Sequence, residues 1–200
     1  MHSSRARNAQ PSDLGVLIRP GIWDDARCTR VRAAMDGGRS MPAEIFRDGY
    51  IVDEHVRRTL DIEVGETTVR EAARMMQNIR HDLAVFSGCA LTRTEGPGFL
   101  RYLSGGFYRV HRDRGNDDLA GQFPRQISVV MFLTTAGGFA NGGCQGGALR
   151  LYGPDDCGGP DVRLDILPVA GTLVAFPSTL CHEVLPVTAG VRDVIVDWFC

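Results

Sequence analysis

Short apolar runs separated by glycine and proline dominate the second half of this 200-residue chain. From Phe99 onward the runs are, in order, FLRYL, FYRVHRD, RQISVVMFL, GALRLYG, VRLDILPVAGTLVAF, HEVLPV and VRDVIVDWF. Runs of this length, rich in β-branched and aromatic residues and bounded by turn formers, are typical of β-strands. About eight such strands in succession predict a β-sandwich or jelly roll.

The first half of the chain carries two segments with helical signals. Residues 24–38 (DDARCTRVRAAMDGG) begin with acidic side chains, which favour a helix N-terminus, and end at two glycines. Residues 67–86 (TTVREAARMMQNIRHDLAVF) place apolar side chains at helical spacing after a threonine cap. The sequence between them has short β-type runs. We therefore expect a mostly β fold with α-helices packed on its outside.

Composition and charge place the chain among soluble globular proteins. We expect residues 1–17 to form a flexible leader and residues 18–200 a single domain, with helical support over about 18–98 and a jelly-roll core over about 99–200. The formal net charge of −2 implies no strong attraction to nucleic acid or to an anionic membrane. No apolar run approaches the roughly 20 residues of a membrane span. The six cysteines show no CxxC spacing and follow no secretory signal, so we expect reduced thiols and a cytoplasmic protein.

Chemistry-bearing residues gather in the strand region. The stretch YLSGGFYRVHRD ends with His111 and Asp113, which point to the same face if the segment is a β-strand. Such a pair can hold a metal ion or form a surface salt bridge. His182 opens a later strand, which a jelly roll can fold back over the first. Two histidines and a carboxylate form the facial triad suited to Fe(II), and a tetrahedral zinc site accepts the same ligands.

Arg192 favours iron over zinc. If His182 and Arg192 lie on consecutive antiparallel strands, the guanidinium reaches into the same cup, where a buried charge needs an anionic partner. A carboxylate is the best match to the arginine fork. A dicarboxylate that chelates the metal at one end would supply that partner at the other. The alternative for Arg192 is a surface salt bridge to Asp193.

These residues resemble the prolyl 4-hydroxylase-type 2-oxoglutarate/Fe(II)-dependent dioxygenase family. The stretch YLSGGFYRVHRD matches the Y-x-x-G-x-x-Y-x-x-H-x-D signature of that family, and GGALRLYG resembles its G-G-x-L strand. The end of the chain, GTLVAFPSTLCHEVLPVTAGVRDVIVDWF, resembles its closing segment, which includes a distal histidine, a basic residue and a tryptophan. The resemblance extends from about residue 18 to the end of the chain.

The resemblance implies a double-stranded β-helix, the cupin-like form of the jelly roll, that binds Fe(II) through His111, Asp113 and His182. Arg192 would bind the far carboxylate of 2-oxoglutarate, and Tyr102 or Tyr108 would line the cosubstrate pocket. O₂ would be consumed, succinate and CO₂ released, and ascorbate is the candidate reductant. Related halogenating enzymes lack the carboxylate, so its presence here favours hydroxylation.

The same resemblance favours a prolyl residue in a peptide or protein as the substrate, hydroxylated at an unactivated C–H bond. The alternative is the same chemistry on a free amino acid or another small metabolite. The stretch Arg47–Glu66 and the glycine-rich Thr134–Gly147, which we expect to be a loop, would flank the mouth of the cup.

Two other classes of protein stay open at this point. A non-catalytic, cupin-like metal-binding or sensing protein would retain metal without consuming 2-oxoglutarate, and Arg192 counts against it. A zinc-dependent hydrolase would need a general base beside the metal. Glu183 is the close candidate for that base, but on a strand it should point away from its neighbour His182.

Overall fold

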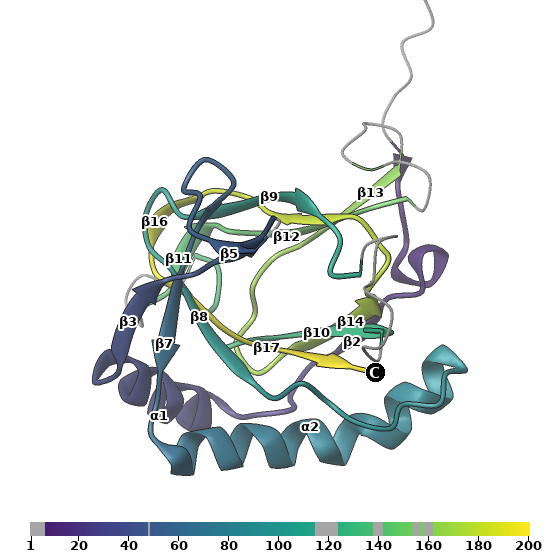
Figure 1. Ribbon diagram of the computed structural model, residues 1–200, viewed down its shortest axis with the longest axis horizontal. Helices are drawn as coiled ribbons and strands as arrows, with labels where there is room; N and C mark the ends of the chain where they lie inside the picture. Colours follow the sequence, from purple (N-terminus) through teal and green to yellow (C-terminus); the bar gives the residue numbers. More distant parts are fainter. Residues whose placement is uncertain (1–6, 48, 115–123, 138–141, 154–156, 158–161) are drawn as a thin grey trace, which may run out of the picture.

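Two β-sheets face each other at the centre of the molecule (Figure 1). The computed structural model describes residues 7–47, 49–114, 124–137, 142–153, 157 and 162–200. The larger sheet has seven strands in the order β2-β14-β10-β17-β8-β7-β3. These are β2 (Leu17–Arg19), β14 (Leu173–Pro177), β10 (Ile127–Phe132), β17 (Arg192–Phe199), β8 (Gly98–Tyr102), β7 (Leu60–Glu63) and β3 (Arg39–Pro42).

The smaller sheet has six strands in the order β1-β13-β12-β15-β9-β6. These are β1 (Arg7–Asn8), β13 (Val162–Ile166), β12 (Leu149–Tyr152), β15 (His182–Val184), β9 (Phe107–His111) and β6 (Arg57–Arg58). Two short antiparallel pairs complete the β-structure: β4 (Ile45–Phe46) with β5 (Tyr50–Ile51), and β11 (Cys144–Gly146) with β16 (Val187–Gly190). The predicted mostly β, jelly-roll architecture is confirmed.

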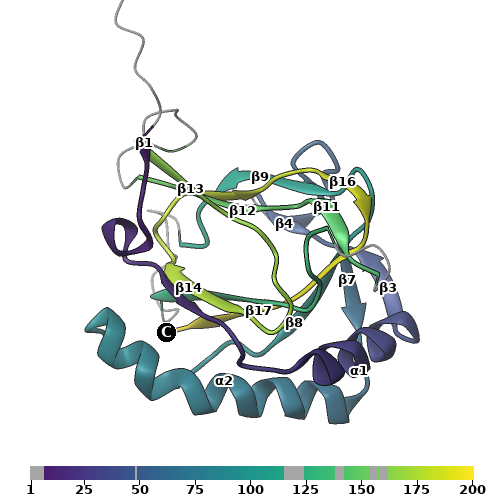
Figure 2. The same ribbon diagram turned by 180° about the vertical axis from the view of Figure 1, so that it is seen from behind.

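Both predicted helices form, and both lie along the outer face of the larger sheet (Figure 2). Helix α1 spans Asp25–Asp36, and the Asp24 carboxylate caps it by accepting a hydrogen bond from the Arg27 backbone N–H at 2.7 Å. Helix α2 spans Glu66–Ser87. Its N-cap is Gly65 with no side-chain cap hydrogen bond, so the expected threonine cap is not formed, because the helix begins one residue before Thr67. It ends at Gly88, whose φ of 68° is the left-handed conformation common at helix ends. No helix in the described part of the chain is long and apolar enough to cross a membrane.

Strand β17 shows how the larger sheet separates two environments. Its side chains alternate between the faces, as strand geometry requires. Arg192, Val194, Val196 and Trp198 line a cavity between the sheets. The intervening residues turn toward the helices, where Ile195 packs in a core with side chains of α1 and α2. The strand therefore carries both the packing that fixes the sheet and the side chains that face the cavity.

A buried carboxylate joins the sheet to α1. Asp193 on β17 is fully buried and accepts hydrogen bonds from Arg101 on β8, with N–O distances of 2.7 and 2.9 Å, and from Arg32 on α1 at 3.2 Å. Arg101 also contacts Asp36 at the end of α1, at 2.7 Å. The alternative pairing of Asp193 with Arg192 is not formed, because the two side chains leave β17 on opposite faces.

We expect Asp193→Ala to lower the free energy of unfolding by about 3 kcal/mol or more, since it leaves the partly buried Arg101 without its main partner. Urea unfolding measures this change. Asp165→Ala is the matched control, because Asp165 also binds an arginine, Arg150, through both carboxylate oxygens, but at a more exposed position. That variant should lose about 1 kcal/mol at most. Equal losses in the two variants would contradict this account of the buried network.

Residues 7–17, predicted to belong to a flexible leader, include a short strand and a 3₁₀ helix. The 3₁₀ helix η1 spans Pro11–Leu14, and Ala9, Leu14 and Val16 are buried in the core between the two sheets. Strand β1 pairs with β13 in parallel. Three apolar residues scattered among polar ones gave no clear strand or helix pattern, although they pack well once the sheets are formed. Residues 1–6 lie outside the described part of the chain.

The glycine-rich stretch Thr134–Gly147 is also more ordered than a plain loop. Its end, Cys144–Gly146, forms β11 and pairs with β16 across a bulge. Gly146 has a φ of 71°, and a Cβ atom there would lie 2.2 Å from the Pro186 carbonyl oxygen, so glycine is required for the close approach of the two strands. Residues 138–141 lie outside the described part.

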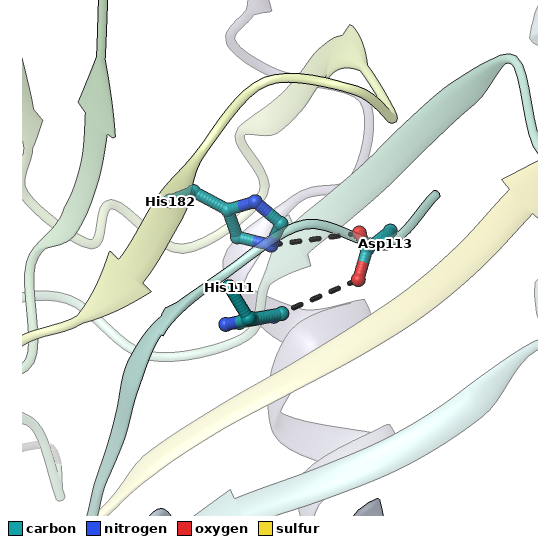
Figure 3. A group of neighbouring side chains, drawn as sticks. All are labelled: His111, Asp113 and His182. Atoms are coloured by element: carbon teal, nitrogen blue, oxygen red, sulfur yellow. Dashed lines mark ion pairs between the residues drawn. The ribbon is translucent and has the colours of Figure 1, made fainter. Parts of the chain in front are cut away.

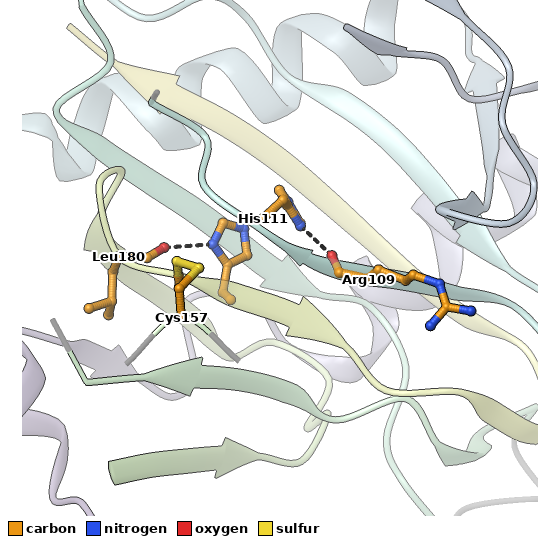
Figure 4. Close-up of a disulfide and its surroundings, with 6 residues drawn as sticks. Arg109, His111, Cys157 and Leu180 are labelled. Atoms are coloured by element: carbon orange, nitrogen blue, oxygen red, sulfur yellow. Dashed lines mark hydrogen bonds between the residues drawn. A yellow bond between two sulfur atoms is a disulfide. The ribbon is translucent and has the colours of Figure 1, made fainter. Parts of the chain in front are cut away.

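Cys157 and Cys181 form a disulfide, contrary to the expectation of reduced thiols (Figure 4). Their Cα atoms are 5.2 Å apart, although 24 residues separate them in the sequence. The absence of CxxC spacing gave no hint of this pair, because the fold, and not the sequence spacing, brings Cys157 to the residue that precedes β15. Cys28, Cys89, Cys144 and Cys200 are free.

Candidate active site

A cavity of about 490 Å³ lies between the two sheets. The larger sheet contributes apolar side chains and Arg192, and the smaller sheet contributes His111 and His182. Other described residues in its wall are Glu44, Ile45, Phe46, Arg47, Tyr50, Val56, Arg57, Leu100, Tyr102, Tyr108, Arg112, Asp113, Arg125, Val129, Val130, Leu149, Val184, Val194, Val196 and Trp198. Arg47, Tyr50, Val56 and Arg57 line the cavity, as expected for the stretch Arg47–Glu66. None of the described residues of Thr134–Gly147 lines it, contrary to expectation.

His111, Asp113 and His182 converge at one point of the wall (Figure 3). His111 and His182 are direct partners in the antiparallel pair of β9 and β15, and their ring centres are 4.1 Å apart. Asp113 follows β9, and its two oxygens lie 3.6 Å from His111 Nε2 and 3.5 Å from His182 Nε2. One ligand atom from each residue lies within 4.8 Å of the others, so the three can hold one metal ion.

Both imidazoles are oriented by backbone carbonyls two residues earlier. The Nδ1 atom of His111 lies 2.8 Å from the Arg109 carbonyl oxygen, and Nδ1 of His182 lies 2.9 Å from that of Leu180 (Figure 4). Nδ1 must carry the hydrogen in each ring to donate to these carbonyls, which leaves Nε2 with a free lone pair. This is the arrangement typical of metal-binding histidines.

The charge states of His182 and Asp113 also suit a metal ion. Burial and the neighbouring His111 lower the pKa of His182 to about 4, so its imidazole is neutral at physiological pH. Burial alone would raise the pKa of Asp113, but the imidazoles of His182 and His111 and the Ser128 hydroxyl together hold that pKa well below its usual range. The cluster therefore offers a neutral imidazole at His182 and a carboxylate at Asp113.

Arg192 is a buried charge with no partner among the described residues. Its side chain is fully buried, and none of its three guanidinium nitrogens forms a hydrogen bond within that part of the chain. The guanidinium carbon lies 4.8 Å from the ring centre of Tyr102 and 5.2 Å from that of Phe132. Burial lowers the pKa of Arg192, but arginine remains protonated in proteins. A buried cation in this position needs an anion, and a carboxylate fits its fork.

The two tyrosines named from the sequence lie in different places. Tyr102 is the cross-strand partner of Arg192 and is almost fully buried beside it. Tyr108 stacks on His111, with ring centres 3.6 Å apart, and burial raises the pKa of its hydroxyl to about 12. Tyr102 therefore belongs to the arginine end of the cavity and Tyr108 to the metal end.

Sequence reasoning missed Arg125 and Glu95. Arg125 donates two hydrogen bonds of 2.6 Å to Glu95, and its guanidinium carbon lies 3.9 Å from the ring centre of Trp198. Both Arg125 and Trp198 line the cavity next to Asp113. Arg125 had no sequence signal, because nothing in its local pattern separates it from the other arginines.

Comparison with known proteins decides the family. Residues 97–200, which include the three cluster residues and Arg192, match the sequence model of the 2OG-Fe(II) oxygenase superfamily. The chain belongs to this superfamily. It is 35% identical over 121 residues to a PKHD-type hydroxylase of Stenotrophomonas maltophilia (strain R551-3), a match that covers 60% of this chain and 48% of that protein. A PKHD-type hydroxylase of Acidovorax ebreus is 31% identical over 72% of this chain and 60% of its own length.

This chain thus spans about half the length of the first of these relatives. Among solved structures, a Pseudomonas putida prolyl-4-hydroxylase has 26% identity and a TM-score of 0.71, with 94% of each chain covered. A prolyl hydroxylase from Trichoplax adhaerens, in complex with a peptide fragment of hypoxia inducible factor, has 22% identity and a TM-score of 0.71 over 95% of this chain and 85% of that one. The latter shows the same fold.

Membership in the superfamily implies Fe(II), 2-oxoglutarate and O₂, and the residues of this chain fit them. The cluster of His111, Asp113 and His182 has the donor set of the facial triad. The unpartnered guanidinium of Arg192 fits the second carboxylate of a dicarboxylate in the same cavity.

The absence of a side chain at Gly147 leaves the space that the Arg192 side chain occupies. We therefore expect Gly147→Ala to weaken 2-oxoglutarate binding about tenfold or more. A Cβ atom at this position would lie 2.8 Å from Arg192 Cδ and 3.0 Å from Val187 Cγ2, so the arginine would have to move. Titration of the Fe(II)-loaded protein with 2-oxoglutarate under anaerobic conditions measures the change.

Gly88→Ala is the matched control for this prediction. Gly88 has a similar φ of 68°, but a Cβ atom there meets nothing within 4 Å. Both variants should lose about 1 kcal/mol of stability from the left-handed backbone, and only Gly147→Ala should lose affinity. Wild-type affinity in Gly147→Ala would show that the position of Arg192 does not depend on this glycine.

Proposed function

We propose that this chain is an Fe(II)- and 2-oxoglutarate-dependent dioxygenase that hydroxylates an unactivated C–H bond and releases succinate and CO₂. In this proposal His111, Asp113 and His182 bind the iron, and Arg192 binds the far carboxylate of 2-oxoglutarate. The observation that carries it is the buried Arg192 guanidinium, which has no described partner and faces the same cavity as the three ligand atoms.

Each part of the cavity has a defined task in this proposal. When bound, iron and 2-oxoglutarate together activate O₂ for attack on the substrate. The Arg109 and Leu180 carbonyls keep both imidazoles in the tautomer that presents Nε2. Apolar side chains in the wall, such as Val130 and Val194, keep bulk water away from the reacting atoms. The Tyr102 ring, 4.8 Å from the guanidinium carbon, helps to hold Arg192 in place through a cation–π contact.

We propose a prolyl residue in a peptide or protein as the substrate. Trp198 and apolar side chains such as Val130 and Val194 line the cavity, which suits the apolar ring of proline. Relatives named PKHD-type hydroxylases and a similar prolyl-4-hydroxylase structure also support it. The second candidate substrate is a free amino acid or another small metabolite. The chemistry would be the same, but a small molecule and not a segment of polypeptide would enter the cavity.

Anaerobic titration of the protein with Fe(II) and 2-oxoglutarate tests the proposal. We expect the weak visible charge-transfer band that arises when a 2-oxo acid chelates iron held by a facial triad. Zn(II) in place of Fe(II) is the control, because it has no such transition. If iron binds and no band appears, the protein is a metal-binding or sensing protein of the same fold, and the proposal fails.

A screen of prolyl peptides, free amino acids and small metabolites for succinate release then identifies the substrate class. Omitting ascorbate from the same assay tests whether this reductant sustains turnover. The zinc hydrolase alternative has lost its candidate base, because the Glu183 carboxylate contacts the Tyr152 hydroxyl and Arg150 and lies outside the cavity wall.

The predicted cytoplasmic location and the disulfide favour different compartments. Disulfides persist mainly in oxidising environments, whereas cytosolic thiols are usually kept reduced. We retain the cytoplasm as the proposed location, in which case the Cys157–Cys181 bond should be reduced in the producing cell. Trapping thiols at the moment of lysis and counting the labelled cysteines tests this: six labelled cysteines support the cytoplasm, and four contradict it.

A further inference from the structure

The cavity wall is strongly basic, in contrast to the chain as a whole. The chain has 22 basic and 24 acidic side chains, and all the basic ones are arginine. The described residues of the wall include five arginines, Arg47, Arg57, Arg112, Arg125 and Arg192, and two carboxylates, Glu44 and Asp113. The proposed function uses Arg192 and Asp113. Four arginines and one glutamate are left, so the remaining wall and the mouth carry an excess of positive charge.

Two of these four arginines are already neutralised. Arg125 binds Glu95 through both carboxylate oxygens, and Arg47 lies 3.7 Å from Asp53. Arg57 and Arg112 form no ion pair with a carboxylate in the described part of the chain.

Arg57 lies close to the metal end of the cavity, and its Nε has no hydrogen-bond partner among the described residues. It is the cross-strand partner of Tyr108, and its guanidinium carbon lies 4.7 Å from the centre of that ring. The Tyr108 ring stacks in turn on His111. One terminal nitrogen of Arg57 donates to the Glu44 carbonyl at 2.8 Å, whereas its Nε is buried with no hydrogen-bond partner among the described residues.

Arg112 directly follows the same histidine, His111, in the sequence. It lies between His111 and Asp113 along the chain, is exposed, and lines the cavity. A guanidinium stacked on an aromatic ring loses little freedom on binding and is well suited to a carboxylate. Arg57 has this ring contact, and Arg112 lines the same cavity. A neutral substrate would leave both without an anionic partner.

We propose that the substrate carries a carboxylate close to the carbon that is hydroxylated, and that Arg57 and Arg112 bind it. This inference rests on the proposed function and narrows its substrate class. The carboxylate has two sources: an aspartate or glutamate beside the target proline in a peptide, or the α-carboxylate of a free amino acid. Arg57 and Arg112 are then specificity-determining residues.

Matched acid and amide compounds test the proposal. One pair is a prolyl peptide with aspartates beside the proline and the same peptide with asparagines; the other is free proline and prolinamide. Succinate release gives kcat and KM for all four compounds. Fluorescence anisotropy of labelled peptides gives Kd, with no turnover required. We expect the acid of one pair to bind about tenfold more tightly than its amide, with an advantage that shrinks at high salt.

Variants of Arg57 separate charge from packing. Arg57→Gln should reduce the preference for the acid to about threefold or less, and Arg57→Lys should retain most of it, because the charge remains. Arg70→Gln is the control, since Arg70 is exposed on α2, pairs only with Glu66 in the described part of the chain, and lies outside the wall of this cavity. It should keep the wild-type preference.

The outcomes distinguish this inference from the proposed function. Preference for the aspartate peptide identifies a peptide acid as the source, and preference for proline over prolinamide identifies an α-carboxylate. Equal binding and turnover within both pairs overturns the inference and leaves the dioxygenase proposal intact. If no compound releases succinate, the proposed function has failed for these substrates, and the anisotropy comparison still decides whether Arg57 recognises an acid.

Discussion

Replacing Asp113 by alanine is expected to reduce 2-oxoglutarate turnover to the background of the metal-free protein. Asp113 is the one carboxylate within reach of both His111 and His182 in the described part of the chain, at 3.6 and 3.5 Å from their Nε2 atoms. Without it, the two imidazoles remain, and a bound metal would lose its anionic ligand and the third point of a facial triad. Succinate release and the amount of Fe(II) retained after desalting measure the loss.

Glu183→Gln is the control for this variant. Glu183 directly follows the ligand His182, but its side chain contacts Tyr152 and Arg150 on the outside of the sheet. The substitution should leave iron retention and turnover within about twofold of wild type, since changes in exposed charge near a site have small effects. Full activity in Asp113→Ala would show that Asp113 is not a metal ligand. Loss of activity in both variants would show that the reaction needs a carboxylate outside the cavity.

The positions of the strands could be predicted from the sequence because their signals are local. Apolar runs bounded by glycine and proline predicted the β-strands after residue 98, an acidic start predicted α1, and helical spacing predicted α2. The pairing of distant strands is not a local property. That His111 and His182 are direct partners follows from the pairing of β9 with β15. The expected jelly roll brought the two strands near each other, but residue patterns did not predict this pairing.

Features that depend on tertiary placement were the ones that sequence reasoning missed. Cys157 and Cys181 approach each other only after β12 and β15 have paired, so their spacing of 24 residues carried no signal. The pairing of Arg125 with Glu95, across 30 residues, is of the same kind. In contrast, the opposite orientation of His182 and Glu183 follows from strand alternation alone, and the structure agrees with it.

Arg192→Met is expected to separate the stability of the free protein from its response to 2-oxoglutarate. The buried guanidinium has no hydrogen-bond partner among the described residues and lies between Tyr102 and Phe132, so it is desolvated without compensation. Methionine has a similar length and packs well against aromatic rings. The free energy of unfolding without cosubstrate should therefore stay unchanged or rise, by about 1–4 kcal/mol.

The response to cosubstrate should change in the opposite direction. Wild-type protein with metal should gain thermal stability as 2-oxoglutarate is added, because the ligand binds the folded state only. In Arg192→Met the ligand loses a buried, charge-assisted contact worth about 2 kcal/mol or more. Its Kd should therefore rise about 30-fold or more, and the thermal shift should disappear at moderate concentrations. Differential scanning fluorimetry over a series of 2-oxoglutarate concentrations measures both quantities.

Two further variants make the result specific to the cavity. Arg192→Lys keeps the charge but not the fork, so it should recover part of the affinity. Arg150→Met makes the same chemical change on the outside of the smaller sheet, where Arg150 binds Asp165, and it should leave the response to 2-oxoglutarate intact. If Arg192→Met binds 2-oxoglutarate as wild type does, the far carboxylate is held elsewhere. A buried cation that is both unpaired and unnecessary for the ligand would then have no explanation in this fold, because its burial is unfavourable in every state that lacks an anion.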